Sequence, residues 1–80
     1  MLMKDLVLYL AKALVNHPDE VEVKEIQGET AAILELRVAK EDLGRIIGKQ
    51  GRTAKSIRTL LNAVASRTNR KIVLEIVEEK

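Results

Sequence analysis

The spacing of apolar residues changes along this 80-residue chain, and that change constrains its fold more than any other feature. Over Leu2–Val15 apolar residues recur every three or four positions, which predicts a helix. Over Glu20–Ile26 and Thr30–Val38 they alternate with polar residues, which predicts two half-buried strands. Only the short Gln27-Gly28-Glu29 turn separates these strands, so we expect an antiparallel hairpin.

The second half of the chain predicts two helices and a third strand. Lys40–Ile47 is typical of a short helix, Arg52–Ser66 of a longer one, and the β-branched run Lys71–Val77 of a strand. The side chains of the longer helix expected to face the core are Ile57, Leu60, Leu61 and Val64. A helical crossover lets the last two strands lie parallel. The sequence therefore predicts one α+β domain in the order α-β-β-α-α-β, with a mixed three-stranded sheet, Thr30–Val38 central and three helices on one face.

Charge is distributed unevenly along the chain. The residues before Leu43 include nine acidic and five basic side chains, whereas Leu43–Leu74 contains eight basic side chains and no acidic one. The eight are Arg45, Lys49, Arg52, Lys55, Arg58, Arg67, Arg70 and Lys71. A solvated helical face is the simpler explanation, but a long stretch with a formal charge of +8 favours a polyanion site, most simply nucleic-acid phosphate.

The residue types that are missing exclude several kinds of chemistry. The chain has no cysteine, which removes disulfides, thiolate metal sites and a thiol nucleophile. His17 is the one histidine and lacks a partner for a catalytic triad, while Tyr9 is the one aromatic residue, which disfavours base stacking on sheet aromatics. We therefore expect no catalytic residue, no metal and no cofactor. Without disulfides or a long apolar segment, we expect a cytoplasmic protein.

The motif Gly48-Lys49-Gln50-Gly51 joins the two predicted helices of the second half. Glycine at both ends lets the backbone approach a phosphate without a Cβ in the way. The helix that begins at Arg52 directs its unpaired N–H groups and positive dipole end toward the same space. Lys49 would pair with a phosphate and Gln50 could donate or accept a hydrogen bond, so this loop is the candidate binding site.

The run Ile47-Gly48-Lys49-Gln50-Gly51, followed by Arg52 and Ile57, resembles the K-homology (KH) signature, in which I-G-x-x-G joins two helices. The element order is similar to the bacterial, type II form of that fold. The length, the Asn16–Asp19 turn and the Gly44–Thr53 run resemble the stand-alone bacterial KH proteins of the KhpA type. The resemblance implies a type II KH fold over residues 1–80, with the N-terminal helix and first strand over 2–27 and the KH core over roughly 30–80.

In that family the loop clamps the backbone of about four nucleotides, so the resemblance implies a single-stranded RNA-binding protein without catalytic activity. It implies a groove between the loop with its two helices and the last strand with the preceding basic loop Arg67–Lys71. The groove floor would be aliphatic, formed by Leu43, Ile47 and Ile72. The residues expected to bind RNA are Arg45, Ile47, Gly48, Lys49, Gln50, Gly51, Arg52, Lys55, Arg70 and Lys71. The contributions of Arg58 and Arg67 stay open.

The same resemblance implies an RNA-chaperone or post-transcriptional role, with an influence on cell elongation and wall synthesis. It also implies a homodimer, or pairing with a larger Jag-type (KhpB-like) KH protein, and no membrane or small-molecule partner. Leu8 and Tyr9 lie off the main apolar stripe of the first helix and supply a surface for such association.

Two other functions fit parts of the sequence. Two helices around a glycine-containing turn also describe a helix-turn-helix DNA-binding protein, although three β-rich segments argue against that motif. A protein-interaction module could instead dock an acidic partner on the basic face. A preference for duplex DNA would favour the first alternative, and failure to bind any nucleic acid at low salt would favour the second.

Overall fold

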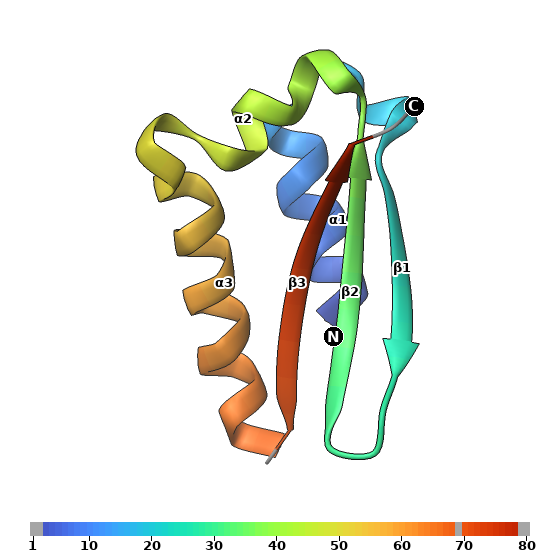
Figure 1. The fold of residues 1–80 in the computed structure, drawn as a ribbon, viewed down its shortest axis with the longest axis vertical. Coiled ribbons are helices and arrows are strands. Elements are labelled where there is room, and N and C mark those ends of the chain that lie inside the picture. The colour runs from blue at the N-terminus through green and yellow to red at the C-terminus, as the bar shows by residue number, and fades with distance from the viewer. Residues whose placement is uncertain (1–2, 69, 79–80) are drawn as a thin grey trace.

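A computed structural model describes residues 3–68 and 70–78 and contains the predicted elements in the predicted order (Figure 1). The helices are α1 (Met3–Leu14), α2 (Leu43–Ile47) and α3 (Arg52–Ala65), and the strands are β1 (Glu22–Gln27), β2 (Ala31–Val38) and β3 (Lys71–Glu78). Short 3-10 turns cover Pro18–Glu20, Lys40–Asp42, Lys49–Gly51 and Ser66–Thr68. Leu2, the predicted start of the first helix, lies outside the described residues.

The sheet has the order β1-β2-β3 and mixes both pairing directions. β1 runs antiparallel to β2, with Val23 opposite Leu36, because the connection at residues 28–30 is short. β3 runs parallel to β2, with Leu74 opposite Leu34. The parallel direction is possible because α2 and α3 carry the chain back to the end of the sheet at which β2 begins. The predicted mixed sheet with a central second strand is confirmed.

The core lies between one face of the sheet and the helices. On β2 burial alternates along the strand, and Leu34, Leu36 and Val38 expose no surface. The helices and β3 add Val7, Ala11, Ile46, Ile57, Leu61 and Leu74 to the same cluster. The opposite face of β2 keeps its side chains partly exposed, so the predicted arrangement of helices on one face is confirmed.

A predicted core face and a predicted association face differ from the structure. On α3 the buried stripe includes Ala54 and Ala65, whereas Leu60 and Val64 are 42% and 40% exposed, so their predicted inward orientation is wrong. The small alanine side chains let the helix approach the sheet closely along that stripe, which rotates the two larger residues away from it. Leu8 packs against the core instead of widening an outer face of α1, where Tyr9 alone of the predicted pair is exposed.

Candidate nucleic-acid interface

The Gly48–Gly51 loop reverses the chain between α2 and α3 because three of its four residues have positive φ. These are Gly48 at 77°, Gln50 at 57° and Gly51 at 75°, and Gln50 is the one non-glycine with positive φ among the described residues. The Gly51 N–H donates to the Gly48 carbonyl at 3.1 Å, which closes the turn. Residues with a Cβ rarely adopt positive φ, so the two glycines allow the backbone to take this conformation at low cost.

The two glycines are required for different reasons. A Cβ at Gly48 would collide with the side chain of Thr53 and lie 2.8 Å from the Thr53 backbone nitrogen. A Cβ at Gly51 would meet no atom within 4 Å. Gly48 is therefore a packing position against the first turn of α3, while Gly51 leaves backbone open to the surroundings, where a phosphate can approach.

Basic and polar side chains surround this open backbone. Lys49, Gln50, Arg52 and Lys55 are all exposed, and the first turn of α3 contains no acidic residue. The Arg52 N–H at the start of α3 donates to the Lys49 carbonyl, and no side chain caps this end, so no side chain neutralises the positive end of the helix dipole. Ile47, at the end of α2, is 39% exposed beside the loop. The structure thus brings together six adjoining predicted site residues, Ile47–Arg52, with Lys55 one helical turn further along.

Arg45 lies apart from this group. It is two residues from Ile47 on α2, which rotates it about 200° around the helix axis. With the amide oxygen of Asn16 oriented toward it, Arg45 donates from Nε at 3.1 Å and from Nη2 at 3.2 Å. This predicted RNA ligand is therefore held against the turn that follows α1.

Arg70 and Lys71 are also separated from the loop. They lie at the start of β3, after the C-terminal end of α3, whereas the loop precedes its N-terminal end (Figure 1). The 14 residues of α3 span about 21 Å between them. Arg70 donates from Nη2 to the Gln27 side-chain oxygen at 2.7 Å, and Asn69 lies outside the described residues. The predicted site thus consists of two basic regions at opposite ends of one helix.

Arg58 connects α3 with the free edge of β3. Its Nε and Nη2 atoms both donate to the Leu74 carbonyl at 3.4 Å. The sequence leaves its role open because steps of three residues rotate a side chain gradually around a helix. Here that rotation, relative to Lys55, carries the guanidinium from the solvent side to the strand, so Arg58 lines the space between α3 and β3.

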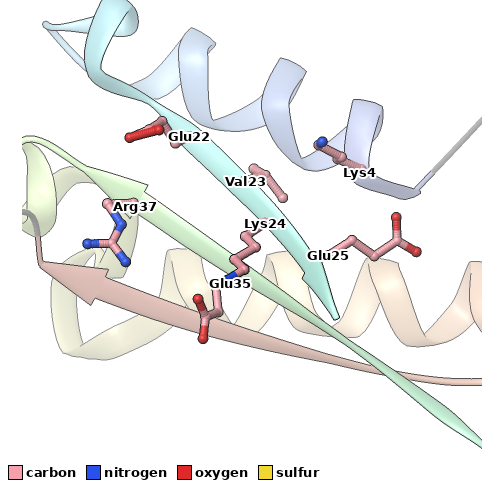
Figure 2. A pocket seen from close by; sticks show the side chains of 7 residues that line it. All are labelled: Lys4, Glu22, Val23, Lys24, Glu25, Glu35 and Arg37. Atoms are coloured by element: carbon pink, nitrogen blue, oxygen red, sulfur yellow. The ribbon is translucent and has the colours of Figure 1, made fainter. Parts of the chain in front are cut away.

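A hollow beside β1 offers a different environment (Figure 2). It is lined by Lys4, Glu22, Val23, Lys24, Glu25, Glu35 and Arg37. Glu22 stands opposite Arg37 and Lys24 opposite Glu35 in the strand register, so opposite charges alternate across the sheet. This balance of three acidic and three basic side chains does not favour a polyanion, which leaves the glycine loop as the candidate site.

The described ranges contain neither a spanning helix nor a metal-binding cluster. No helix within residues 3–68 and 70–78 has the length and apolar character needed to cross a bilayer. Within the same ranges, no three His, Cys, Asp or Glu side chains converge as metal ligands would.

Comparison with known proteins gives close relatives over almost the whole chain. Residues 4–76 match the family model described as KhpA/KhpB, KH domain. The chain is 59% identical to the RNA-binding protein KhpA of Chlamydia caviae over 78 residues, covering 98% of this chain and all of the relative. It is 55% identical to that of Clostridium acetobutylicum, covering 94% and 100%, and 50% identical to that of Borreliella burgdorferi, covering 92% and 90%. No solved structure matches. By both the family model and these relatives, the chain belongs to the KhpA/KhpB family of KH domains, with the type II KH fold that its sequence predicted.

Proposed function

We propose that this protein binds single-stranded RNA without catalysing a reaction, and that the Gly48–Gly51 loop clamps the RNA backbone. The observation that carries the proposal is the loop itself, where positive-φ backbone, an uncapped helix start and exposed basic side chains face one open space. The relatives named RNA-binding proteins share at least half of their aligned residues with this chain. A single KH groove reads about four nucleotides, so the proposed target is a short unpaired segment.

Each part of the proposed site has a separate task. The open backbone at Gly51 and the positive dipole end of α3 receive a phosphate, and Lys49 neutralises its charge. Ile47 contributes apolar surface for the unstacked bases. Arg58, beside the β3 edge, has N–H groups in reach of a base lying between α3 and β3.

We expect salt to weaken RNA binding because the proposed site contacts phosphates with basic side chains. If two to four phosphates are neutralised, log K falls against log salt with a slope of about −1.5 to −3 for single strands. Fluorescence anisotropy with a labelled unstructured oligoribonucleotide at several salt concentrations measures this slope.

The same titration separates the alternatives. A salt-independent affinity would remove the electrostatic mechanism. Tighter binding to duplex DNA than to the oligoribonucleotide would favour the helix-turn-helix alternative. Absence of binding to any nucleic acid at low salt would favour a protein-interaction module.

We also propose that the protein associates, either with a second copy or with a Jag-type (KhpB-like) KH protein. The outer side of α3 supports this, because Leu60 and Val64 are large, exposed and adjacent at helical spacing. Leu60 also borders an apolar hollow that includes Thr59 and Ala63. Tyr9 on α1 is the competing position that the sequence favoured.

Charged substitutions at the two positions distinguish these surfaces. We expect Leu60→Asp to convert a dimer to a monomer in analytical ultracentrifugation, because a carboxylate cannot be buried unpaired in an apolar contact. Tyr9→Asp is the matched control and should leave the dimer intact. The opposite result would place the contact on α1, and a wild-type monomer at high concentration would exclude the homodimer.

For the cell, we propose a cytoplasmic protein with an RNA-chaperone or post-transcriptional role that influences cell elongation and wall synthesis. The resemblance to the KhpA type supports this. Crosslinking in cells followed by sequencing of the bound RNA tests the proposal. Recovery of no RNA above background from cells that express the protein would contradict it.

A further inference from the structure

Asp42 is the one buried polar or charged side chain in the described part of the chain. It stands just before α2, where an acidic residue usually caps its own helix, but it makes no such bond. Its carboxylate instead accepts three hydrogen bonds from residues 25 and 26 positions earlier. The donors are the Asn16 backbone at 3.1 Å, the His17 backbone at 2.9 Å and the His17 Nδ1 atom at 2.9 Å.

A second contact joins the same two segments. With its amide oxygen oriented toward Arg45, the Asn16 side chain accepts two hydrogen bonds from that residue, which lies one helical turn beyond Asp42. The Asn16–His17 turn is therefore attached both to the residue before α2 and to the outer side of α2. We call these four residues, Asn16, His17, Asp42 and Arg45, the latch.

The latch acts on a short helix whose position depends on its tertiary contacts. α2 has five residues, fewer than an isolated helix needs for stability in water. Ile46 is buried in the core and Leu43 packs against it, so apolar contacts hold the inner face of α2, while the latch adds polar contacts from the Asn16–His17 turn. Gly48, the first residue of the loop, follows directly after α2, so a rotation of α2 would move the proposed phosphate site.

We infer that Asp42 is a positioning residue for the RNA-binding loop, because its buried carboxylate latches α2 to the Asn16–His17 turn and so fixes where the loop begins. Asn16 and Arg45 complete the attachment. The inference rests on the proposed function of the loop, and it gives Arg45 a structural task in place of a phosphate contact.

The charges around the latch agree with this geometry. The hydrogen bond to Asp42 raises the pKa of His17 above its ordinary value; partial burial of the ring opposes the shift, and Glu41 and Glu20 add to it. Burial of Asp42 tends to raise the pKa of its carboxyl, but the hydrogen bonds from Asn16 and His17 outweigh burial and lower it. The charged latch is therefore complete between these two pKa values. It weakens as pH rises through the pKa of His17 or falls through that of Asp42.

A matched pair of substitutions tests the inference by the sign of the effect. Asp42→Asn and Glu41→Gln each remove one negative charge beside α2, and Glu41 is exposed. Electrostatics alone would make both variants bind RNA more tightly. We expect Glu41→Gln to keep or improve the affinity, whereas Asp42→Asn weakens it about threefold to tenfold, a range typical of changes that touch no ligand.

The loop itself supplies a measurement that needs no RNA. In 15N–1H spectra we expect the amide signals of Gly48 and Gly51 to shift in Asp42→Asn and to stay in place in Glu41→Gln. If wild-type protein binds no RNA, the proposed function fails, but these signals still decide whether Asp42 positions the loop. A folded Asp42→Asn variant with unchanged loop signals and tighter RNA binding would overturn the inference.

His17→Gln covers the case in which Asp42→Asn does not fold. It removes the titrating ring and keeps the two backbone hydrogen bonds to Asp42. We expect the loop amide signals of the wild type to move as pH rises through the raised pKa of His17, and those of His17→Gln to stay constant. If the loop amide signals of the wild type do not move as His17 titrates, the inference would also be overturned.

Discussion

Replacing Lys49 and Gln50 together with aspartate lowers the affinity for single-stranded RNA at least tenfold, or about 1.4 kcal/mol. The change removes one positive charge and adds two negative ones where the proposed site receives a phosphate. Like charges at that distance repel, and the start of α3 cannot offset two carboxylates and a phosphate. Fluorescence anisotropy with a labelled oligoribonucleotide measures the loss.

The fold should tolerate this double substitution. Both side chains are exposed, and aspartate adopts the positive φ of Gln50 more readily than glutamine does. We expect the free energy of unfolding to change by about 0.5 kcal/mol or less, as for ordinary surface substitutions. Lys12→Glu with Ala13→Glu makes the same total change in charge at exposed positions of α1 and should affect binding far less. If the folded loop variant binds RNA as tightly as wild type, the loop is not the binding site, and the Arg67–Lys71 region becomes the leading candidate.

Gly48→Ala has the largest expected effect on stability. Alanine at φ 77° and ψ 174° is strained by about 1–3 kcal/mol, and its Cβ would also collide with Thr53. A domain of this size has only about 4–12 kcal/mol of total stability, so the loss is a substantial fraction of it. We expect the melting temperature to fall by about 10 °C, measured by circular dichroism.

Two other glycines provide the controls. Gly44 lies inside α2, and a Cβ added there would meet no atom within 4 Å, so Gly44→Ala should stabilise the protein by about 0.5–1 kcal/mol. Gly51→Ala should lose stability only through the strain of its positive φ, because a Cβ there meets no neighbouring atom. The expected order of stability is Gly44→Ala, wild type, Gly51→Ala and Gly48→Ala. A Gly48→Ala variant as stable as Gly51→Ala would show that contact with Thr53 does not constrain the loop.

The order of elements could be predicted because local periodicity determines it. Alternation along Thr30–Val38 identifies a strand with one buried face, and Leu34, Leu36 and Val38 indeed lie in the core. A short glycine turn predicts the antiparallel pair, and a helical crossover predicts the parallel pair. The position of the glycine loop between two helices follows from the same reasoning.

The details that escape prediction depend on contacts distant in sequence. Periodicity indicates that α3 has an apolar side but does not fix its centre, so it places Leu60 in the core and omits Ala65. Asp42 looks like an ordinary acidic residue before a helix, since nothing local marks its partners 25 and 26 residues away. Shared positive charge also suggests one site for Arg70 and the loop, whereas the length of the helix between them keeps the two apart.

The parallel pairing of β2 with β3 determines when the glycine loop acquires its shape during folding. The 32 residues from Ala39 to Arg70, which include the loop, all lie in the connection between these two strands. The β1–β2 hairpin has local contacts and can form within microseconds, but closing the long connection costs more entropy and is slower. We therefore expect the glycine loop to become ordered as β3 joins the sheet, so substitutions in the β2–β3 pairing should delay the appearance of the proposed RNA binding in a refolding experiment.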